Sequence, residues 1–287
     1  MGGADGVHGH SGGGRLLSWP STTHTGDDDQ VTQYLDPLSS FRLDGRTALV
    51  TGASSGLGAR FAAVLTAAGA RVALVARRAE RLKKLAAELP GSVAVVADIS
   101  VPADVIRMVD ETLDQLGRVD VLVNNAGTGD VSPAETQPLE DFVRTIEVNL
   151  IGAYHASQVV GRHMLERGSG SIINVASVLG FVSGSPIPQP GYAASKSALV
   201  NLSRELAAQW GRRGVRVNAL CPGWFRTEMT DQMFATEEGL RWIDRRTALG
   251  RGGADGELDG ALLWLASDAS SYVTGSSIVV DGGYLAL

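Results

Sequence analysis

The chain has little of what marks secreted, membrane-spanning or nucleic-acid-binding proteins. It has one cysteine, Cys221, in 287 residues, so no disulfide can form within the chain, which suits a reducing cytosol. Its apolar runs, such as residues 261–266, are far shorter than the ~20 residues that span a bilayer. The net charge is −6 and no stretch is rich in lysine or arginine. We therefore expect a cytoplasmic protein that binds neither membrane nor nucleic acid.

The first forty residues lack the apolar side chains needed for a core. Residues 1–15 are rich in glycine and histidine, and residues 21–30 in serine, threonine, glycine and aspartate. Such a composition cannot bury enough apolar surface to offset the entropy of ordering. Residues 1–40 are therefore predicted to be a flexible tail, whose scattered histidines form no metal site, followed by one domain over residues 41–287.

Strand-like and helix-like patterns alternate through the rest of the chain. Strands rich in valine, isoleucine, leucine or alanine are predicted at residues 47–50, 71–76, 92–97, 119–124, 171–175, 216–220 and 277–280. This alternation predicts an α/β fold, with a single Rossmann-type, doubly wound parallel sheet of about seven strands and helices on both faces. Ligands of such sheets bind outside the carboxyl ends of the strands, where the strand order reverses.

A glycine-rich turn separates the first strand from the first helix. The turn reads Thr51-Gly-Ala-Ser-Ser-Gly-Leu-Gly, with the spacing G-x-x-x-G-x-G rather than G-x-G-x-x-G. Glycines let the backbone approach a pyrophosphate, and the free N–H groups of the helix N-terminus bind it. The residues predicted to contact a dinucleotide here are Gly52, Ser54, Ser55, Gly56, Leu57 and Gly58.

Tyr192 and Lys196 lie one helical turn apart, so both side chains can face the same cleft. The pKa of a free phenol is ~10, and a neighbouring ammonium is expected to lower the pKa of Tyr192 toward neutral pH. A phenol tuned in this way exchanges protons with a substrate efficiently. Taken alone, however, such a pair is more often a half-buried ring beside a solvated charge.

Together these motifs resemble the short-chain dehydrogenase/reductase family. Further matches occur in the family's order from about Asp44 to the C-terminus, namely Asn124-Asn-Ala-Gly127, Asn149, Ser177, Tyr192, Lys196, Pro222-Gly223 with Thr227, and Asp281-Gly-Gly283. The resemblance implies an NAD(P)-dependent oxidoreductase of the EC 1.1.1 type, acting on a carbonyl or secondary alcohol as a homodimer or homotetramer. Within the family, the chain is most similar to 3-oxoacyl reductases and gluconate 5-dehydrogenases.

The resemblance also implies the roles of four catalytic residues. Ser177 would donate a hydrogen bond to the substrate carbonyl, and Tyr192 would supply the proton to it. Lys196 would hold the ribose hydroxyls of the cofactor and lower the pKa of the tyrosine. Asn149 would hold a water that links the lysine to solvent, and a satisfied interior amide is the structural alternative for this residue.

A second group of residues is implied to contact the cofactor. It comprises Asp98, Ile99, Asn125, Ala126, Gly127, Tyr192, Lys196, Pro222, Gly223 and Thr227. Asp98 would face the adenine amino group, with a helix N-cap as its competing role. Thr227 would hold the carboxamide of the nicotinamide.

Arg77 and Arg78 follow the second strand, where NAD-preferring relatives usually carry aspartate. A guanidinium pairs with the 2′-phosphate of NADP(H), whereas a carboxylate would repel it. Cations at a helix N-terminus oppose the helix dipole unless an anion is present, which argues against a merely solvated basic patch. We therefore predict NADP(H), with NAD(H) as the alternative, and expect Arg77 to be the main contact and Arg78 a secondary one.

Two features near the expected substrate mouth leave alternatives open. Ser177 and Tyr192 are 15 residues apart, about two more than is common in the family, and the extra length falls in the proline-rich residues 184–190. Residues 223–234 form either a lid over an apolar substrate or an ordinary surface helix with a buried stripe. The large apolar residues of this segment are Trp224, Met229, Met233 and Phe234.

Other activities on this scaffold fit less well. A nucleotide-binding sensor without turnover would be expected to lack Ser177, Tyr192 or Lys196, and all three are present. Lyases and isomerases of the family carry a larger C-terminal region, and enoyl reductases space the tyrosine and lysine more widely.

Overall fold

In the described part of the chain, seven parallel strands form one sheet in the order β3-β2-β1-β4-β5-β6-β7. They are β1 (Thr47–Thr51), β2 (Arg71–Ala76), β3 (Val93–Val96), β4 (Val121–Asn124), β5 (Gly170–Val175), β6 (Val215–Pro222) and β7 (Ser277–Val280). The computed structural model describes residues 1–3 and 36–287, so most of the predicted tail lies outside the described residues. The predicted doubly wound parallel sheet is confirmed.

Helices cover both faces of this sheet. One layer consists of α1 (Gly56–Ala67), α2 (Ala79–Glu88) and α9 (Asp259–Ala266). The other layer consists of α3 (Pro102–Leu116), α5 (Ala153–Arg167) and α6 (Pro190–Trp210), with α4 (Leu139–Ile146) packed on α6. Within residues 1–3 and 36–287, no helix combines the length and the apolar composition needed to cross a membrane.

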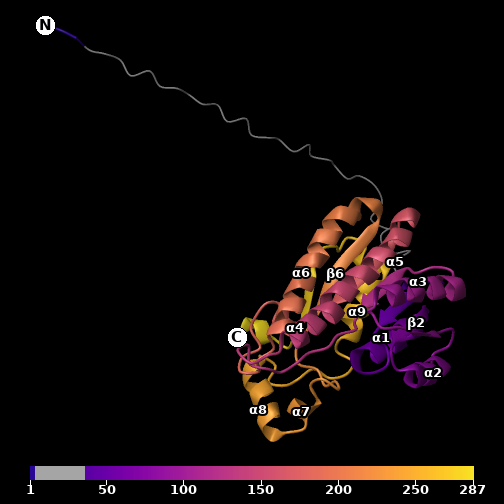
Figure 1. Ribbon diagram of the computed structural model, residues 1–287. Coiled ribbons are helices and arrows are strands. Elements are labelled where there is room, and N and C mark those ends of the chain that lie inside the picture. The colour runs from indigo at the N-terminus through magenta and orange to yellow at the C-terminus, as the bar shows by residue number, and fades with distance from the viewer. Residues whose placement is uncertain (4–35) are drawn as a thin grey trace. The chain divides into compact units, whose positions relative to one another are not determined.

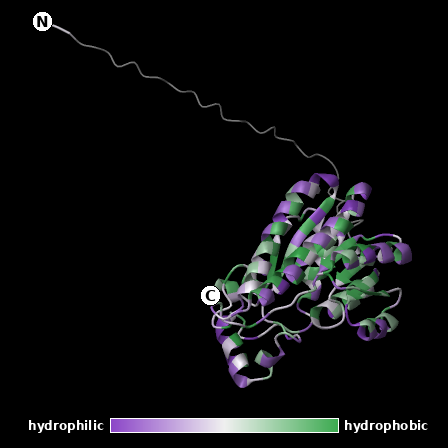
Figure 2. Cartoon of the chain, viewed as in Figure 1, coloured by the Kyte–Doolittle hydropathy of each residue, from purple (hydrophilic) through white to green (hydrophobic). Residues whose placement is uncertain are grey.

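The strands are apolar because both of their faces are buried. In β1, Leu49 packs in the layer of α3 and α5, whereas Ala48 and Val50 pack in the layer of α1 and α9. This is the two-residue period of a strand that lies between two helical layers. Figure 2 shows the strands as mostly hydrophobic and the helices as striped with hydrophilic residues.

Proline and glycine mark the ends of several helices. Pro102 and Pro190 lie in the first turns of α3 and α6, where a missing N–H removes no intrahelical hydrogen bond. α3 and α5 end at Gly117 and Gly168, whose φ angles of +81° and +74° are left-handed. Local residue chemistry therefore sets where these helices begin and end.

The strand order reverses beside β1, which lies between β2 and β4. Val50 of β1 pairs with Leu74 on one side and with Val123 on the other. The connections on the two sides of this point run in opposite directions, so a crevice opens at the carboxyl ends of β1 and β4. The glycine turn that follows β1 and the Asn125 segment that follows β4 therefore flank the same crevice.

Beyond β6 the chain forms two further helices, seen at the lower end of Figure 1. They are α7 (Asp231–Phe234) and α8 (Glu237–Arg246). An aromatic cluster ties this region to the body of the domain. The ring of Trp224, which is 6% exposed, lies 5.0 Å from the ring of Trp242 and 6.2 Å from that of Tyr284. Edge-to-face ring packing of this kind holds the segment in place.

Candidate active site

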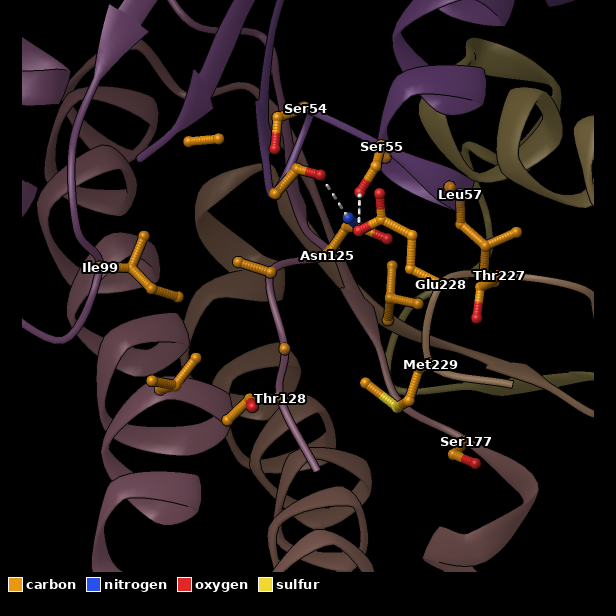
Figure 3. A pocket seen from close by; sticks show the side chains of 18 of the residues that line it. Ser54, Ser55, Leu57, Ile99, Asn125, Thr128, Ser177, Thr227, Glu228 and Met229 are labelled. Atoms are coloured by element: carbon orange, nitrogen blue, oxygen red, sulfur yellow. Dashed lines mark hydrogen bonds between the residues drawn. The ribbon is translucent and has the colours of Figure 1, made fainter. Parts of the chain in front are cut away.

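A cleft of about 780 Å³ opens at the carboxyl ends of the central strands. Every predicted catalytic or cofactor-binding residue lines it except Asn149. Figure 3 looks into this cleft, with Ser54 and Ser55 at one end, Ser177 at the other and Asn125 between them. The fold thus brings together residues that lie far apart in the sequence.

The glycine turn has a shape that only glycine allows. Gly52 and Gly56 have φ angles of +69° and +50°. A Cβ atom on Gly52 would lie 2.8 Å from the Cα of Ala126, and one on Gly58 would lie 2.5 Å from the Nδ2 of Asn125. The backbone therefore packs without side chains where a pyrophosphate has to approach, and the turn fits a dinucleotide.

The β4 end of the cleft is held by hydrogen bonds to β1. Thr51 Oγ1 accepts from the backbone N–H groups of Asn125 and Ala126 at 3.0 and 3.1 Å. Asn125 Nδ2 donates to the Thr51 carbonyl at 3.0 Å. These bonds fix the floor of the cleft between the two strands.

The Pro222-Gly223 and Asp281-Gly-Gly283 motifs meet behind the site. A Cβ atom on Gly223 would lie 2.6 Å from the Cα of Asp281, so this contact requires glycine. The Asp281 carboxylate accepts from the backbone N–H groups of Gly283 and Leu285 at 2.8 and 2.9 Å. These contacts position the loop that follows β6, on which Thr227 lies.

Three predicted catalytic side chains lie together at the inner end of the cleft. Ser177 follows β5 and is 8% exposed, while Tyr192 and Lys196 come from α6. Lys196 Nζ lies 5.4 Å from the centroid of the Tyr192 ring and donates to the carbonyl oxygen of Val175 at 2.7 Å. The phenol, the hydroxyl and the ammonium thus face one space, as predicted.

The sequence predicts a lowered pKa for Tyr192, and the structure of the chain shows this prediction to be wrong. Burial raises the pKa of Tyr192, and a hydrogen bond with Ser177 opposes that rise. Lys196 does not offset the burial, because its ammonium bonds to Val175 and lies over the ring. At neutral pH the phenol therefore carries its proton, which is the form required of a general acid.

Burial also acts on Lys196 and on the neighbouring Cys221. It lowers the pKa of Lys196 to about 8, with Cys221 acting weakly in the opposite direction. It raises the pKa of the Cys221 thiol to about 12, against the influence of Lys196. Because the thiolate is the reactive form of cysteine, this buried thiol is inert.

The buried ammonium of Lys196 is expected to make the free energy of unfolding depend on pH. The pKa is about 8 in the folded chain against 10.5 for a free lysine, so the unfolded chain binds this proton more tightly. The resulting loss of stability, about 3 kcal/mol, is complete below pH 8 and fades as the pH rises to 10.5. Relative to Lys196→Met, the wild type should therefore gain stability between pH 7 and 10, as measured by urea unfolding.

The exposed Lys84 on α2 offers the matched control for this experiment. Lys84→Met removes a lysine without removing a buried charge, so its stability difference from the wild type should not change with pH in the same way. Parallel pH dependences for the wild type and Lys196→Met would contradict the assigned cost of burial.

Asn149 lies outside the cleft lining, in a π-helical turn, Glu147–Gly152, between α4 and α5. Its Oδ1 accepts from the backbone N–H of Thr128 at 2.8 Å, and its Nδ2 donates to the Thr128 carbonyl at 2.8 Å and to Ser195 Oγ at 3.0 Å. Both polar atoms of the Asn149 side chain are hydrogen-bonded within the protein. The residue therefore matches its structural alternative, an interior amide whose hydrogen bonds are satisfied. It positions the loop after β4, and a part in a proton relay stays a prediction.

The two arginines after β2 have different partners in the structure, and the predicted division of their contacts with the cofactor stays a prediction. Arg78 donates to Ser54 Oγ at 2.9 Å and also to Ser55 Oγ. Arg77 is more exposed and lies 3.6 Å from the carboxylate of Asp98. In the structure Arg78, rather than Arg77, is therefore the guanidinium directed at the glycine turn.

Asp98 does not cap α3, whose N-cap residue is Val101. Its Oδ1 accepts from the backbone N–H and the hydroxyl of Ser100 at 3.0 and 2.7 Å. The side chain lines the cleft beside Arg77, and its contact with an adenine stays a prediction.

The predicted lid residues separate into two groups. Trp224, Met233 and Phe234 belong to a hydrophobic cluster with Ile243, as the buried-stripe alternative expects. Met229 is exposed and is the one of these four residues that lines the cleft.

Sequence reasoning missed two charged residues at the outer end of the cleft. Glu228 follows Thr227 and lines the cleft, and Arg81 on α2 pairs with it at 2.6 Å. The large apolar residues of segment 223–234 dominate its sequence pattern and give no signal for Glu228. The only available signal for Arg81 was its position one turn after Arg77 and Arg78 on the same basic helix start.

Fold and cleft together define a dinucleotide-binding α/β protein, and comparisons with known proteins agree. A family model described as enoyl-(acyl carrier protein) reductase matches residues 52–285. The galactitol 2-dehydrogenase (L-tagatose-forming) of Cereibacter sphaeroides is 41% identical over 253 residues, which cover 87% of this chain and 99% of that protein. The gluconate 5-dehydrogenase of Gluconobacter oxydans (strain 621H) is 40% identical over 251 residues, covering 85% and 96%.

A similar solved structure is that of a gluconate 5-dehydrogenase from Burkholderia cenocepacia J2315 in complex with NADP and tartrate. It superposes with a TM-score of 0.83 at 37% identity and covers 87% of this chain and 99% of that one. The chain is therefore an oxidoreductase of the short-chain dehydrogenase/reductase family, as its motifs predicted.

Proposed function

We propose that this protein transfers a hydride between NADP(H) and a carbonyl or secondary alcohol of a polyol or sugar acid. The observation that carries the proposal is the placement of Ser177, Tyr192 and Lys196 at the inner end of a cleft whose outer end holds Arg78. The similar proteins named above act on galactitol and gluconate, and one of them was solved with NADP. These names support the substrate class and the cofactor.

The chemistry follows from the positions of three side chains. When bound, the nicotinamide donates or accepts the hydride. Tyr192, which burial keeps protonated, gives its proton to the carbonyl oxygen during reduction. Ser177 donates a hydrogen bond to the same oxygen, where negative charge develops in the transition state. Lys196 holds the ribose hydroxyls, and its positive charge stabilises the phenolate that remains.

Gly129, Gln189 and Met229 form one wall beside the ring of Tyr192. A Cβ atom on Gly129 would lie 3.3 Å from the tyrosine ring, 3.6 Å from the sulfur of Met229 and 3.8 Å from Oε1 of Gln189. The glycine leaves room beside the phenol, and the glutamine offers hydrogen bonds to hydroxyl groups. This wall suits a hydroxylated chain better than a bulky apolar substrate.

A screen of substrates against both cofactors tests the proposal. Polyols and sugar acids with NADP⁺, and the matching ketoses and keto acids with NADPH, should be turned over faster than simple aliphatic ketones. Faster turnover with NADH than with NADPH would overturn the cofactor assignment and favour an NAD-dependent alcohol dehydrogenase.

Substitutions of the two arginines are expected to change the preference between NADPH and NADH. Arg78→Gln is expected to raise the KM for NADPH about tenfold and to leave the KM for NADH within about twofold, because the 2′-phosphate loses a charged fork of donors. Arg77→Gln, the matched variant, should have the smaller effect. Initial rates with each cofactor decide between them, and a larger effect of Arg77→Gln would restore the original sequence-based assignment.

We also propose that the protein works as a homodimer or homotetramer. Leu139 and Val143 of α4 and Ile151 and Tyr154 near the start of α5 are exposed in the single chain, from 42% to 73%. Apolar side chains clustered on neighbouring helices favour an interface between subunits.

A further inference from the structure

The loop after β6 reaches across to the glycine turn after β1. A Cβ atom on Gly56 would lie 3.6 Å from Cβ of Thr227, so the two segments are in contact. The next residue, Glu228, accepts a hydrogen bond from Ser55 Oγ at 3.1 Å, drawn as a dashed line in Figure 3. This contact joins residues 173 positions apart in the sequence.

The carboxylate of Glu228 lies between two arginines. Arg78 Nη1 donates to its two oxygens at 3.3 and 3.0 Å, and Arg81 Nη1 donates to it at 2.6 Å. Arg81 and then Arg78 lower the pKa of Glu228, so the group is an anion at neutral pH. An anion thus occupies a site formed by two guanidinium groups and a hydroxyl.

One of these donors, Arg78, is the group proposed above to bind the 2′-phosphate of the cofactor. Arg78 bonds to Ser54 and Ser55 of the glycine turn, and all three residues line the cleft. Carboxylates and phosphates use the same fork of guanidinium donors. A carboxylate and a phosphate dianion repel each other, so both cannot occupy this site together.

We propose that Glu228 is a specificity-determining residue that competes with the 2′-phosphate of NADP(H) for Arg78, Arg81 and Ser55. Binding of NADP(H) requires the carboxylate to leave this site, whereas NAD(H), which has no 2′-phosphate, leaves the Glu228 contacts in place. The residue therefore weakens NADP(H) binding selectively and narrows the preference between the two cofactors. This inference rests on the proposed use of NADP(H).

The size of the effect follows from the exposure of the contacts. The Glu228 side chain is 57% exposed and its arginine partners are 41% and 54% exposed. Exposed ion pairs are weak, so a phosphate dianion displaces the carboxylate without abolishing binding. Removing the charge of Glu228 is therefore expected to tighten NADPH binding about three- to tenfold.

Glu228→Gln tests the proposal, because glutamine keeps the size of the side chain and can still accept from Ser55 but carries no charge. The dissociation constants of NADPH and NADH are measured by fluorescence titration of the full chain. The constant for NADPH should fall about three- to tenfold and that for NADH should change less than about twofold. Glu111→Gln on α3, which also removes one exposed ion pair with an arginine, is the control and should change neither constant.

The possible results separate failure of this inference from failure of the proposed cofactor. If the wild type binds NADPH tightly and Glu228→Gln binds it equally or more weakly, Glu228 supports the phosphate site and the inference is overturned. If Glu228→Gln binds NADPH and NADH more tightly by the same factor, Glu228 competes with the pyrophosphate that both cofactors carry. That result also overturns the inference. A wild type that binds NADH but not NADPH would overturn the cofactor proposal itself.

Discussion

Tyr192→Phe is expected to lower kcat by about a hundred- to ten-thousandfold, the range that general acid catalysis contributes. The substitution removes one hydroxyl and leaves the ring that packs beside Lys196. The substrate oxygen then keeps the hydrogen bond from Ser177 but loses the group that transfers a proton to it, and Lys196 cannot replace that group because it bonds to Val175 and lies over the ring. Affinity for NADPH should stay within about threefold of the wild type, because the remaining cleft is unchanged.

Tyr272→Phe is the matched control, since this tyrosine is fully exposed. It should leave both kcat and the dissociation constant of NADPH unchanged in steady-state and binding measurements. Retention of more than about a tenth of the wild-type kcat by Tyr192→Phe would refute its assignment as proton donor.

Gly58→Ala should have a similarly large effect, on cofactor binding and on stability. The added Cβ would overlap the carbonyl oxygen of Gly52 and lie 2.5 Å from Nδ2 of Asn125, so the glycine turn and α1 would have to separate. We expect NADPH affinity to fall at least about tenfold, because the turn and the helix N-terminus bind the pyrophosphate together. The free energy of unfolding should fall by about 1–3 kcal/mol, as is usual for an overpacked site.

Gly260→Ala in α9 separates this effect from the general consequence of placing alanine in a helix. A Cβ atom at Gly260 meets nothing within 4 Å. This variant should therefore gain about 0.5–1 kcal/mol of stability from its alanine and bind NADPH normally. Cofactor titration and thermal unfolding of both variants provide the comparison, and normal NADPH affinity in Gly58→Ala would contradict the role given to the turn.

Local patterns predicted the sheet because its strands are buried on both faces. The strands predicted at residues 71–76 and 277–280 coincide with β2 and β7. Residues 119 and 120 were included in the fourth strand but precede β4. The backbone of Asp120 still bonds to Thr47 and Ser171, and its carboxylate also accepts from the backbone N–H of Thr47. Apolar composition alone does not show at which of these residues the strand begins.

The cofactor cleft was also predictable in large part, because its residues follow the carboxyl ends of parallel strands. Ends of neighbouring parallel strands meet at one edge of the sheet, so motifs after β1, β4, β5 and β6 must lie close together. The directions of individual side chains were not predictable in the same way. Arg77 and Arg78 are adjacent in sequence, yet one lies beside Asp98 and the other beside Ser54.

The sequence by itself determined the parallel α/β sheet and the glycine turn, because each depends on local spacing and burial, and it predicts Tyr192 as the proton donor. Tertiary structure alone decided the protonation of Tyr192 and the pairing of Glu228 with Arg78 and Arg81. Burial sets the first of these, and a loop that crosses the cleft sets the second. Both depend on which groups face each other across distant segments, which no local pattern of residues encodes.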